Sequence, residues 1–399
     1  MLIKRRTFLQ SGSLAAAGFL VPDFLKALEK PMMIPQGNKA LVILQLSGGN
    51  DGLNTVIPVR NDIYYRSRPH LGIQPGNSLA LNGECNLHAS LPAFKELYDE
   101  GHLAILNSVG YPNPDRSHFR SMDIWQTASN SNEYLQTGWL GRYLDAQCHG
   151  CDKPTQALEM DDVLSLAMKG NEYKGIALKD PARLYNTSNE NWYRDLQQAQ
   201  NGRTIEKPVD YLYKVMGETL SGAEYIYTQS KLRPSSASYP STPLGKNLHT
   251  IASLILSDIN TSVYYVSLGS FDTHVNQAAQ QQRLFGELND AVKVFVQDLK
   301  ENNRFREVAL VTFSEFGRRV TQNASGGTDH GTANNMFVIS GGLQRKGLVN
   351  PLPDLTNLDD GDLRYQVDFK SVYATLLHKW LQADDQLILG KKFEQLDFF

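Results

Sequence analysis

The sequence predicts an α/β fold: a mostly parallel, doubly wound sheet with helices on both faces and one irregular insertion. Short apolar or β-branched runs alternate with longer stretches of helical periodicity, which is typical of parallel strands joined by helical crossovers. The first run, residues 40–46 (ALVILQL), is apolar almost throughout and ends at a Ser-Gly-Gly turn. That pattern is expected of a strand covered on both faces.

Charge and composition exclude several classes of protein. The chain has 399 residues, 41% of them hydrophobic and 20% charged. This is enough for one large α/β domain, and it is unlike a disordered chain, a collagen-like fibre or a polytopic membrane protein. The 39 Lys and Arg nearly balance the 42 Asp and Glu, which gives no reason to expect nucleic acid as a partner.

The cysteines are too few for a disulfide scaffold, since the chain has only three. Cys148 and Cys151 form a lone C-x-x-C pair, which is weak evidence for zinc. In an exported protein this spacing favours a local disulfide, which would leave Cys85 unpaired.

The first residues resemble an export signal. Arg5 and Arg6 precede Phe8 and a weakly apolar run over residues 11–21, as in a twin-arginine (Tat) signal. The alternative is an ordinary basic start leading into a helix. The apolar run is too short, and too rich in Gly and Ala, for a stable transmembrane span. We expect export of the folded chain through the Tat translocon to the periplasm or cell surface.

The remaining chain divides into few parts. Residues 1–35 are assigned to the signal and 36–399 to a single domain, with an insertion at about 150–245. The irregular stretch 154–208 is expected to cover one edge of this domain, because it mixes short apolar runs with Asn, Lys and Asp. The Pro-Ser-rich stretch 234–243 is expected to be a loop.

A local sequence pattern predicts each strand and helix. Residues 103–107 repeat the aliphatic pattern of a strand, residues 261–268 are β-branched and aromatic, and 307–313 (EVALVTF) and 336–340 complete the strands. In the helix predicted at 90–100, Ser90 can cap and Pro92 is tolerated in the first turn. Helical periodicity predicts the remaining helices, at 117–125, 138–147, 209–232, 245–257, 276–301 and 369–381.

Carboxylates and imidazoles flank four of these strands. In open α/β sheets, ligands bind just beyond the carboxyl ends of the strands, so these side chains are expected at one rim. The rim candidates, taken as metal ligands, are Asp51, Asp272, His274, Glu315, Asp329 and His330.

Structural alternatives remain open for these candidates. Asp51 lies in a Gly-Gly-Asn-Asp-Gly stretch that can be simply a turn, and Asp272 can cap the following helix. Glu315 can pair with Arg318 or Arg319. Asp272 and His274 are two residues apart in an extended segment, so their side chains point to the same side and can coordinate one ion. Asp329 and His330 lie among glycines, where an Asp-His pair has little structural purpose, so a metal-ligand role is favoured for both.

A further candidate site precedes the helix predicted at 117–125. Ser117 falls at or near the helix N-terminus, where free N–H groups and the dipole favour an oxyanion. Its hydroxyl can act as a nucleophile if a metal or base removes its proton, or it can serve only as an N-cap. His118 is a candidate ligand or general acid, and Arg116 a candidate for binding an anionic substrate group.

Several motifs together resemble one known family. The Tat-like start, LQLSGGNDGLN, RSHF, SFDTH, TFSEFGR and TDHG look like the secreted bacterial family catalogued as domain of unknown function 1501. That family is similar to the alkaline-phosphatase superfamily, which includes phosphatases, arylsulfatases and cofactor-independent phosphoglycerate mutases. The resemblance implies an alkaline-phosphatase-like fold over nearly the whole mature chain.

The resemblance also implies roles for single residues. It makes Asp51 a ligand of one metal and Ser117 the nucleophile, and it assigns Asp272, His274 and His330 to the other metal. Glu315-Phe316-Gly317 stands where the superfamily has Asp-His-Gly, so one imidazole is missing. Asp329 or His118 would supply the lost ligand.

These implications amount to a functional hypothesis. The chain is expected to be an exported hydrolase of phosphate or sulfate esters, with a serine nucleophile and one or two divalent ions acting on an anionic ester. Imidazole and oxygen ligands suit Zn²⁺ or Mn²⁺, whereas carboxylates alone favour Mg²⁺ or Ca²⁺. The alternative is a non-catalytic envelope binding or assembly protein that keeps the fold. A mutase or transferase with the same nucleophile is not separable by sequence.

Overall fold

The computed structural model describes residues 39–147, 155–190 and 222–399. The predicted signal, the Cys148–Cys151 pair and the first part of the helix expected at 209–232 lie outside these ranges. Residues 222–232 of that helix are described and are helical.

The domain is built around one large sheet, and its strand order is β11-β5-β10-β9-β1-β8-β6-β7, with β14 also paired to β5. All of its pairings are parallel except those of β10, which runs antiparallel to both β5 and β9. The strands are β1 (Ala40–Leu46), β5 (Leu103–Gly110), β6 (Ala157–Glu159), β7 (Ile176–Ala177), β8 (Val263–Leu268), β9 (Val308–Phe313), β10 (Asn334–Ser340), β11 (Gly347–Leu348) and β14 (Val367–Asp368).

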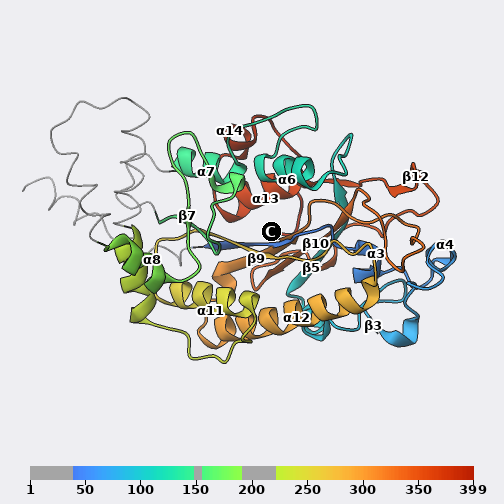
Figure 1. The fold of residues 1–399 in the computed structure, drawn as a ribbon, viewed down its shortest axis with the longest axis horizontal. Helices are drawn as coiled ribbons and strands as arrows, with labels where there is room; N and C mark the ends of the chain where they lie inside the picture. The colour runs from blue at the N-terminus through green and yellow to red at the C-terminus, as the bar shows by residue number, and fades with distance from the viewer. Residues whose placement is uncertain (1–38, 148–154, 191–221) are drawn as a thin grey trace, which may run out of the picture. The chain divides into compact units, whose positions relative to one another are not determined.

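Helices cover both faces of the sheet, so the predicted mostly parallel α/β class is confirmed (Figure 1). On one face lie α5 (Pro92–Asp99), α11 (Pro243–Leu256) and α12 (Gln277–Glu301). On the other lie α6 (His118–Thr127), α7 (Trp139–Gln147) and α13 (Phe369–Thr375). Shorter helices are α3 (Gly52–Thr55), α4 (Asp62–Ser67), α8 (Pro181–Ser188) and α14 (Asp385–Leu389).

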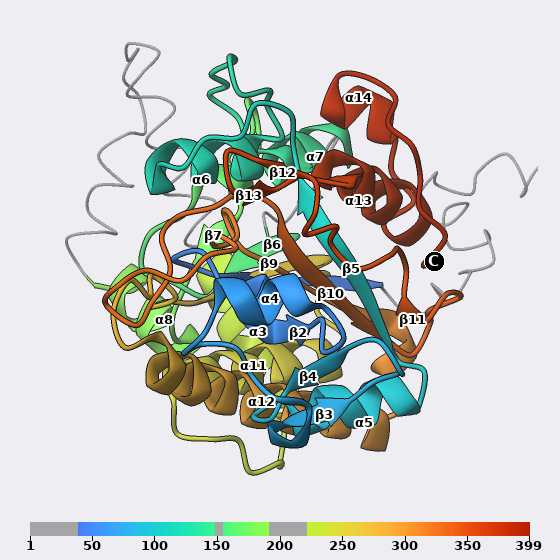
Figure 2. The same cartoon turned by 90° about the vertical axis from the view of Figure 1, so that its right-hand side faces the viewer.

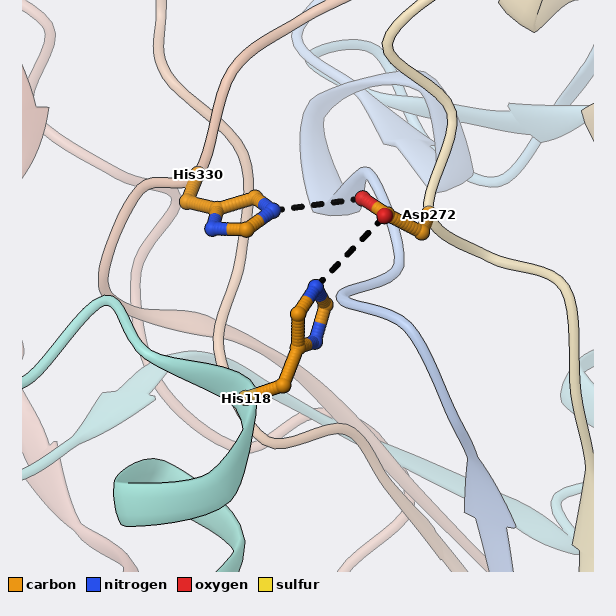
Figure 3. A group of neighbouring side chains, drawn as sticks. All are labelled: His118, Asp272 and His330. Carbon is orange, nitrogen blue, oxygen red and sulfur yellow. Dashed lines mark hydrogen bonds and ion pairs between the residues drawn. The ribbon is translucent and has the colours of Figure 1, made fainter.

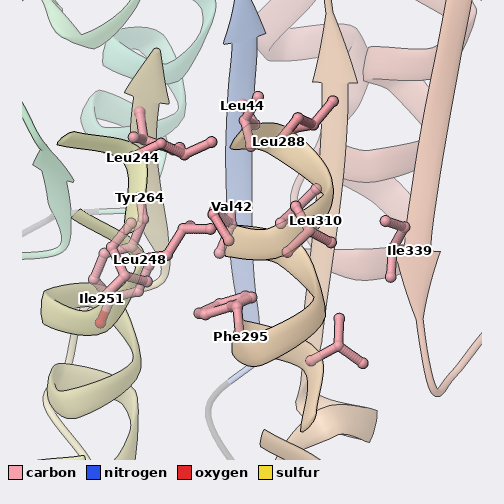
Figure 4. Close-up of a cluster of buried hydrophobic side chains, with 14 of the residues drawn as sticks. Val42, Leu44, Leu244, Leu248, Ile251, Tyr264, Leu288, Phe295, Leu310 and Ile339 are labelled. Atoms are coloured by element: carbon pink, nitrogen blue, oxygen red, sulfur yellow. The ribbon is translucent and has the colours of Figure 1, made fainter. Parts of the chain in front are cut away.

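The central strand β1 explains why its sequence is apolar throughout. Val42 pairs with Tyr264 of β8 on one side and with Leu310 of β9 on the other. Successive side chains of a strand point to opposite faces, so Val42 and its alternates enter the core beneath α11 and α12, as Figure 4 shows. Ile43 enters the core on the α6 and α13 face. Both faces of the strand are therefore buried.

Short segments surround the carboxyl-end loops of the sheet. A small sheet of β2 (Val56–Ile57), β4 (Asn86–His88) and β3 (Ser78–Ala80) lies beside α3 and α4, as the rotated view shows (Figure 2). The pair β12 (Leu358–Asp359) and β13 (Asp362–Leu363) forms a second small sheet. Among the described residues, no helix is both long and apolar enough to cross a membrane.

Some boundaries differ from those predicted. Ser90 does not cap α5: the N-cap is Leu91, which makes no side-chain cap bond. Helix α11 begins at Pro243, which was expected in the loop, because Thr242 caps it and proline suits the first turn. The insertion also does more than cover the edge, since β6 and β7 extend the main sheet.

The first prediction concerns the core beneath β1. Leu288→Ala is expected to lower the free energy of unfolding by about 2–5 kcal/mol, because it leaves a cavity in a fully buried cluster. Denaturant unfolding followed by circular dichroism measures the change. Leu387→Ala, at an exposed leucine of α14, is the matched control and should shift stability by less than about 0.5 kcal/mol.

The second prediction concerns Glu159 in β6. Burial raises the pKa of this carboxyl to about 7, although the Ser165 backbone N–H donates to it. A carboxyl whose folded pKa lies above its unfolded value destabilises the fold once it ionises. Stability should therefore fall as the pH rises from about 4.5 to 7, by about 3 kcal/mol. Glu159→Gln should flatten this slope; an unchanged slope would assign it to other groups.

Candidate metal centre

The candidate site lies at one edge of the main sheet. The segments that follow β1, β5, β8 and β9 reach this edge because those strands are parallel to one another. The segment that precedes β10 reaches the same edge because β10 runs in the opposite direction. The connection between β9 and β10 therefore lies wholly at this edge, where it meets the three segments that follow β1, β5 and β8.

Gly48 allows two of these segments to approach closely. Its φ is +118°, and a Cβ at this position would lie 2.4 Å from the backbone nitrogen of Asp272. Any other residue would push the loop after β1 away from the loop after β8. The Gly-rich turn therefore serves the close approach of two loops as well as the reversal of the chain.

The buried guanidinium of Arg318 holds the loops together. It donates to Asp272 Oδ1 at 2.8 Å and to four backbone carbonyls. The carbonyls belong to the loops after β1, after β8 and before β10: Gly48, Gly49 (2.6 Å), Phe271 (3.0 Å) and Thr328 (3.0 Å). One side chain thus satisfies acceptors from three loops and fixes the carboxylate of Asp272.

Three imidazoles surround this carboxylate. The Nε2 atoms of His274 and His330 lie 3.0 and 3.2 Å from Asp272 Oδ1. The Nε2 atom of His118 lies 3.6 Å from Asp272 Oδ2. Figure 3 shows His118, at the start of α6, and His330 pointing toward Asp272 from different segments. Donor atoms of His118, Asp272 and His330 all lie within 4.8 Å of one another, close enough to hold one metal ion.

Two of the imidazole rings, those of His330 and His118, are oriented by hydrogen-bond acceptors at Nδ1, the ring nitrogen that points away from Asp272. His330 Nδ1 lies 2.8 Å from the carbonyl oxygen of Arg116, which can only accept, so Nδ1 carries the proton. His118 Nδ1 lies 3.0 Å from Oε1 of the buried Glu315, which favours the same tautomer. Both Nε2 atoms then present a lone pair, as in metal sites whose ligand histidines are fixed by a second shell.

His274 completes the group. Its Nδ1 lies 3.2 Å from Asp329 Oδ1, and its Nε2 lies 2.9 Å from His330 Nε2. Two facing nitrogen lone pairs repel at this distance unless a proton or a cation lies between them. The distance between the two rings therefore requires either a proton on one Nε2 atom or a cation between them.

The charge states of the group suit cation binding. Burial raises the pKa of Asp272, but the hydrogen bond from Arg318 and the charge of its guanidinium outweigh burial and lower the pKa to about 2. A hydrogen bond from Asn323 lowers the pKa of Asp329. Burial lowers the pKa of His330, which favours its neutral form. Ionised carboxylates beside a neutral imidazole are the forms that bind a cation.

Glu315 does not form the ion pair that was an alternative for it. Its Oε1 accepts from the Gly48 backbone N–H at 2.7 Å as well as from His118. Arg318 is directed instead at Asp272 and the backbone carbonyls. Glu315 therefore orients a candidate ligand, a role that the sequence did not predict.

Asp51 is separate from the imidazoles. It caps α3 by accepting from Leu53 N, and it is ion-paired with the buried Arg68 at 2.6 Å. Gln277 also donates to its second oxygen. With these partners the carboxylate is fully engaged, and Asp51 is absent from the compact group of donors. The structure thus gives no support to the prediction that Asp51 is a ligand of one metal ion.

Ser117 and Arg116 directly precede His118. Ser117 is the exposed N-cap of α6, and its side chain makes no cap hydrogen bond, so capping does not explain its presence. The Arg116 guanidinium is ion-paired with the buried Asp362 and lies 3.5 Å from Asp360. An anion would have to compete with these carboxylates for Arg116.

Sequence reasoning missed the central role of Arg318. The residue was considered only as a partner of Glu315, and its contacts with distant carbonyls leave no periodicity or spacing to detect. His118, Asp272, His274, Glu315, Asp329 and His330 were all candidates, and the structure brings these six together.

Comparisons with known proteins give a family and several distant structures. Residues 103–395 match the family described as "Protein of unknown function (DUF1501)", and no curated protein matches the chain. The lipoteichoic acid synthase LtaP from Listeria monocytogenes is 11% identical over 91% of this chain and 74% of its own, with a TM-score of 0.39.

Two further solved structures are similar at the same level. For the PsFucS1 sulfatase from Pseudoalteromonas sp., identity is 12%, coverage is 90% of this chain and 71% of that one, and the TM-score is 0.42. The C-terminal periplasmic domain of EcEptC from Escherichia coli in complex with Zn is 12% identical. The match covers 77% of this chain and 74% of that one, with a TM-score of 0.36.

The third prediction concerns metal binding. The full chain titrated with ZnCl₂ in a calorimeter is expected to bind one equivalent. Asp272→Asn and His330→Ala should each weaken binding about 100-fold, and Glu315→Gln about 10-fold, because it only orients His118. His70→Ala, at an exposed histidine outside the group, is the control. Equal affinity in all variants would rule out this centre.

Proposed function

Because this chain belongs to the DUF1501 family and directs three imidazoles at one carboxylate beside an exposed serine, we propose that it is a metal-dependent hydrolase of phosphate or sulfate esters. One observation carries the proposal. Each imidazole has its Nδ1 on an acceptor and its Nε2 toward Asp272. An arrangement serving only stability would have little use for this convergence of lone pairs.

The donor set favours Zn²⁺ or Mn²⁺. Imidazole nitrogens with one carboxylate suit these ions better than Mg²⁺ or Ca²⁺, which prefer oxygen ligands. His118, Asp272 and His330 would hold the ion, with His274 as a fourth donor. When bound, a cation there would polarise an ester oxygen and lower the pKa of a nearby hydroxyl. We propose one ion rather than two, because Arg68 and Gln277 occupy Asp51.

Ser117 is proposed as the nucleophile. Its neighbours on both sides contact the centre: the Arg116 carbonyl accepts from His330, and the His118 ring faces Asp272. The hydroxyl is exposed and makes no cap bond. Its oxygen would bond to the phosphorus or sulfur as the alcohol leaves with a proton, and water would then cleave the serine ester. The N-terminal N–H groups of α6 would stabilise the oxyanion.

The remaining residues hold the site in shape. Arg318 keeps Asp272 ionised and joined to the loops after β1 and β8. Glu315 keeps the His118 ring in one orientation. Since these contacts exist before any substrate arrives, little reorganisation is needed during the reaction.

We also propose that the chain acts outside the cytoplasm, on the basis of Arg5, Arg6 and the apolar run that follows. Replacing both arginines by lysine should retain the protein in the cytoplasm, as fractionation would show. A non-catalytic envelope protein with the same export signal remains the competing function.

The fourth prediction tests catalysis. With Zn²⁺ or Mn²⁺ present, the purified protein is expected to hydrolyse p-nitrophenyl phosphate or p-nitrophenyl sulfate. Ser117→Ala should lower kcat at least 1000-fold and leave Zn²⁺ affinity unchanged, because the hydroxyl forms the covalent ester. Ser238→Ala, at an exposed serine away from the site, should retain full activity.

Two outcomes would contradict the proposal. Turnover that persists in Ser117→Ala would remove this residue from the mechanism. A wild-type protein that binds one Zn²⁺ but hydrolyses neither ester would favour the non-catalytic envelope protein.

A further inference from the structure

A cavity opens beside the metal centre, and we infer that it binds the alcohol part of the ester as an uncharged sugar ring. This inference rests on the proposed hydrolase function. The cavity volume is about 430 Å³, within the range of small-molecule sites. Its lining includes Asp115, Arg116, Phe316, Asp360, Arg364 and Tyr365.

The cavity and the centre share two walls. Phe316 lines the cavity, and the centroid of its ring lies 4.6 Å from that of His330 and 4.9 Å from that of His118. Arg116 lines the cavity, and its carbonyl accepts from His330. Asp115, another lining residue, is two positions from Ser117, to whose backbone N–H its side chain is bonded at 2.7 Å. A group in the cavity would therefore lie next to the proposed nucleophile.

The charge of the lining excludes a second anion. Three carboxylates, those of Asp115, Asp359 and Asp360, line the cavity together with two guanidinium groups. Arg116 is ion-paired with the buried Asp362, and Arg364 lies 3.9 Å from Asp359. The lining thus has a small excess of negative charge, and both of its cations have carboxylate partners. A substrate whose body carries another phosphate or sulfate would be repelled.

Apolar groups near the centre favour a ring with an apolar face. Tyr365 lines the cavity and is 41% exposed. Phe119 and Val275, which follow His118 and His274 in the chain, are 87% and 62% exposed. Of these three side chains, only Tyr365 lines the cavity, and it offers a ring face to a bound group.

Polar groups in the same cavity favour a sugar over a plain aryl group. Asn113 and Asp360 line the cavity, and their side-chain atoms can bond ring hydroxyls. The Tyr365 ring would pack against the C–H face of the sugar. A neutral sugar esterified once would satisfy all three features: one anion for the metal centre, hydroxyls for the polar groups and an apolar face for the tyrosine.

The test measures binding without turnover. Zn²⁺-loaded Ser117→Ala protein would be titrated with inorganic phosphate, glucose 6-phosphate, glucose 6-sulfate and glucose 1,6-bisphosphate. At least one glucose monoester should bind 10-fold or more tighter than phosphate, and the bisphosphate at least 10-fold weaker than glucose 6-phosphate. Adding Tyr365→Ala should weaken binding of that monoester about 10-fold and leave phosphate unchanged. Adding Tyr134→Ala instead, at an exposed tyrosine outside the cavity, should change neither.

The outcomes separate this inference from the proposed function. Phosphate binding without any gain from the sugar, or with equal affinity for the bisphosphate, would overturn the sugar cavity and leave the metal centre standing. A protein that binds neither phosphate nor any ester would overturn the hydrolase and the cavity together. An unchanged monoester affinity in the Tyr365→Ala variant would also reject the cavity.

Discussion

The buried guanidinium of Arg318 is the interaction on which the site depends. A buried charge is costly unless it is paired and hydrogen-bonded. All three guanidinium nitrogens of Arg318 donate, to one carboxylate and four carbonyls in total. Those acceptors belong to three separate loops. The loops must therefore converge on Arg318, and in doing so they place Asp272 where the three imidazoles meet.

The direction of β10 makes this convergence complete. In a wholly parallel sheet, a segment that precedes a strand lies at the opposite edge from the ligand-binding loops. Because β10 is antiparallel to β5 and β9, the loop carrying His330 lies instead at the carboxyl edge. A histidine that precedes its strand thus joins an aspartate that follows another. The single reversed strand contributes an imidazole that the parallel strands alone would not have supplied.

Much of the fold and part of the site follow from local pattern. The continuous apolar run around Val42 and the positions of Asp272 and His330 next to predicted strands are visible in the sequence, and they led to the correct edge of the sheet. The structural role of Asp51 could not be predicted from the sequence, because it depends on contacts with Arg68 and with Gln277, which is 226 residues away. A turn aspartate looks the same whether it binds a metal or neutralises a buried arginine, and only the three-dimensional partners decide between the two.

The same contacts would prepare the site for the cation that we propose. Fixing the Nδ1 protons of His118 and His330 on Glu315 and on a carbonyl directs their Nε2 lone pairs inward in advance. Little side-chain entropy then remains to be lost on binding, and the repulsion between converging lone pairs is relieved by the ion itself. The positive charge of Arg318 would repel a cation at this site. The same charge keeps the Asp272 carboxyl ionised, and its hydrogen bond holds that carboxylate in place. In the proposed metal centre, we infer that this arrangement would favour precise placement of the cation at the cost of some electrostatic affinity.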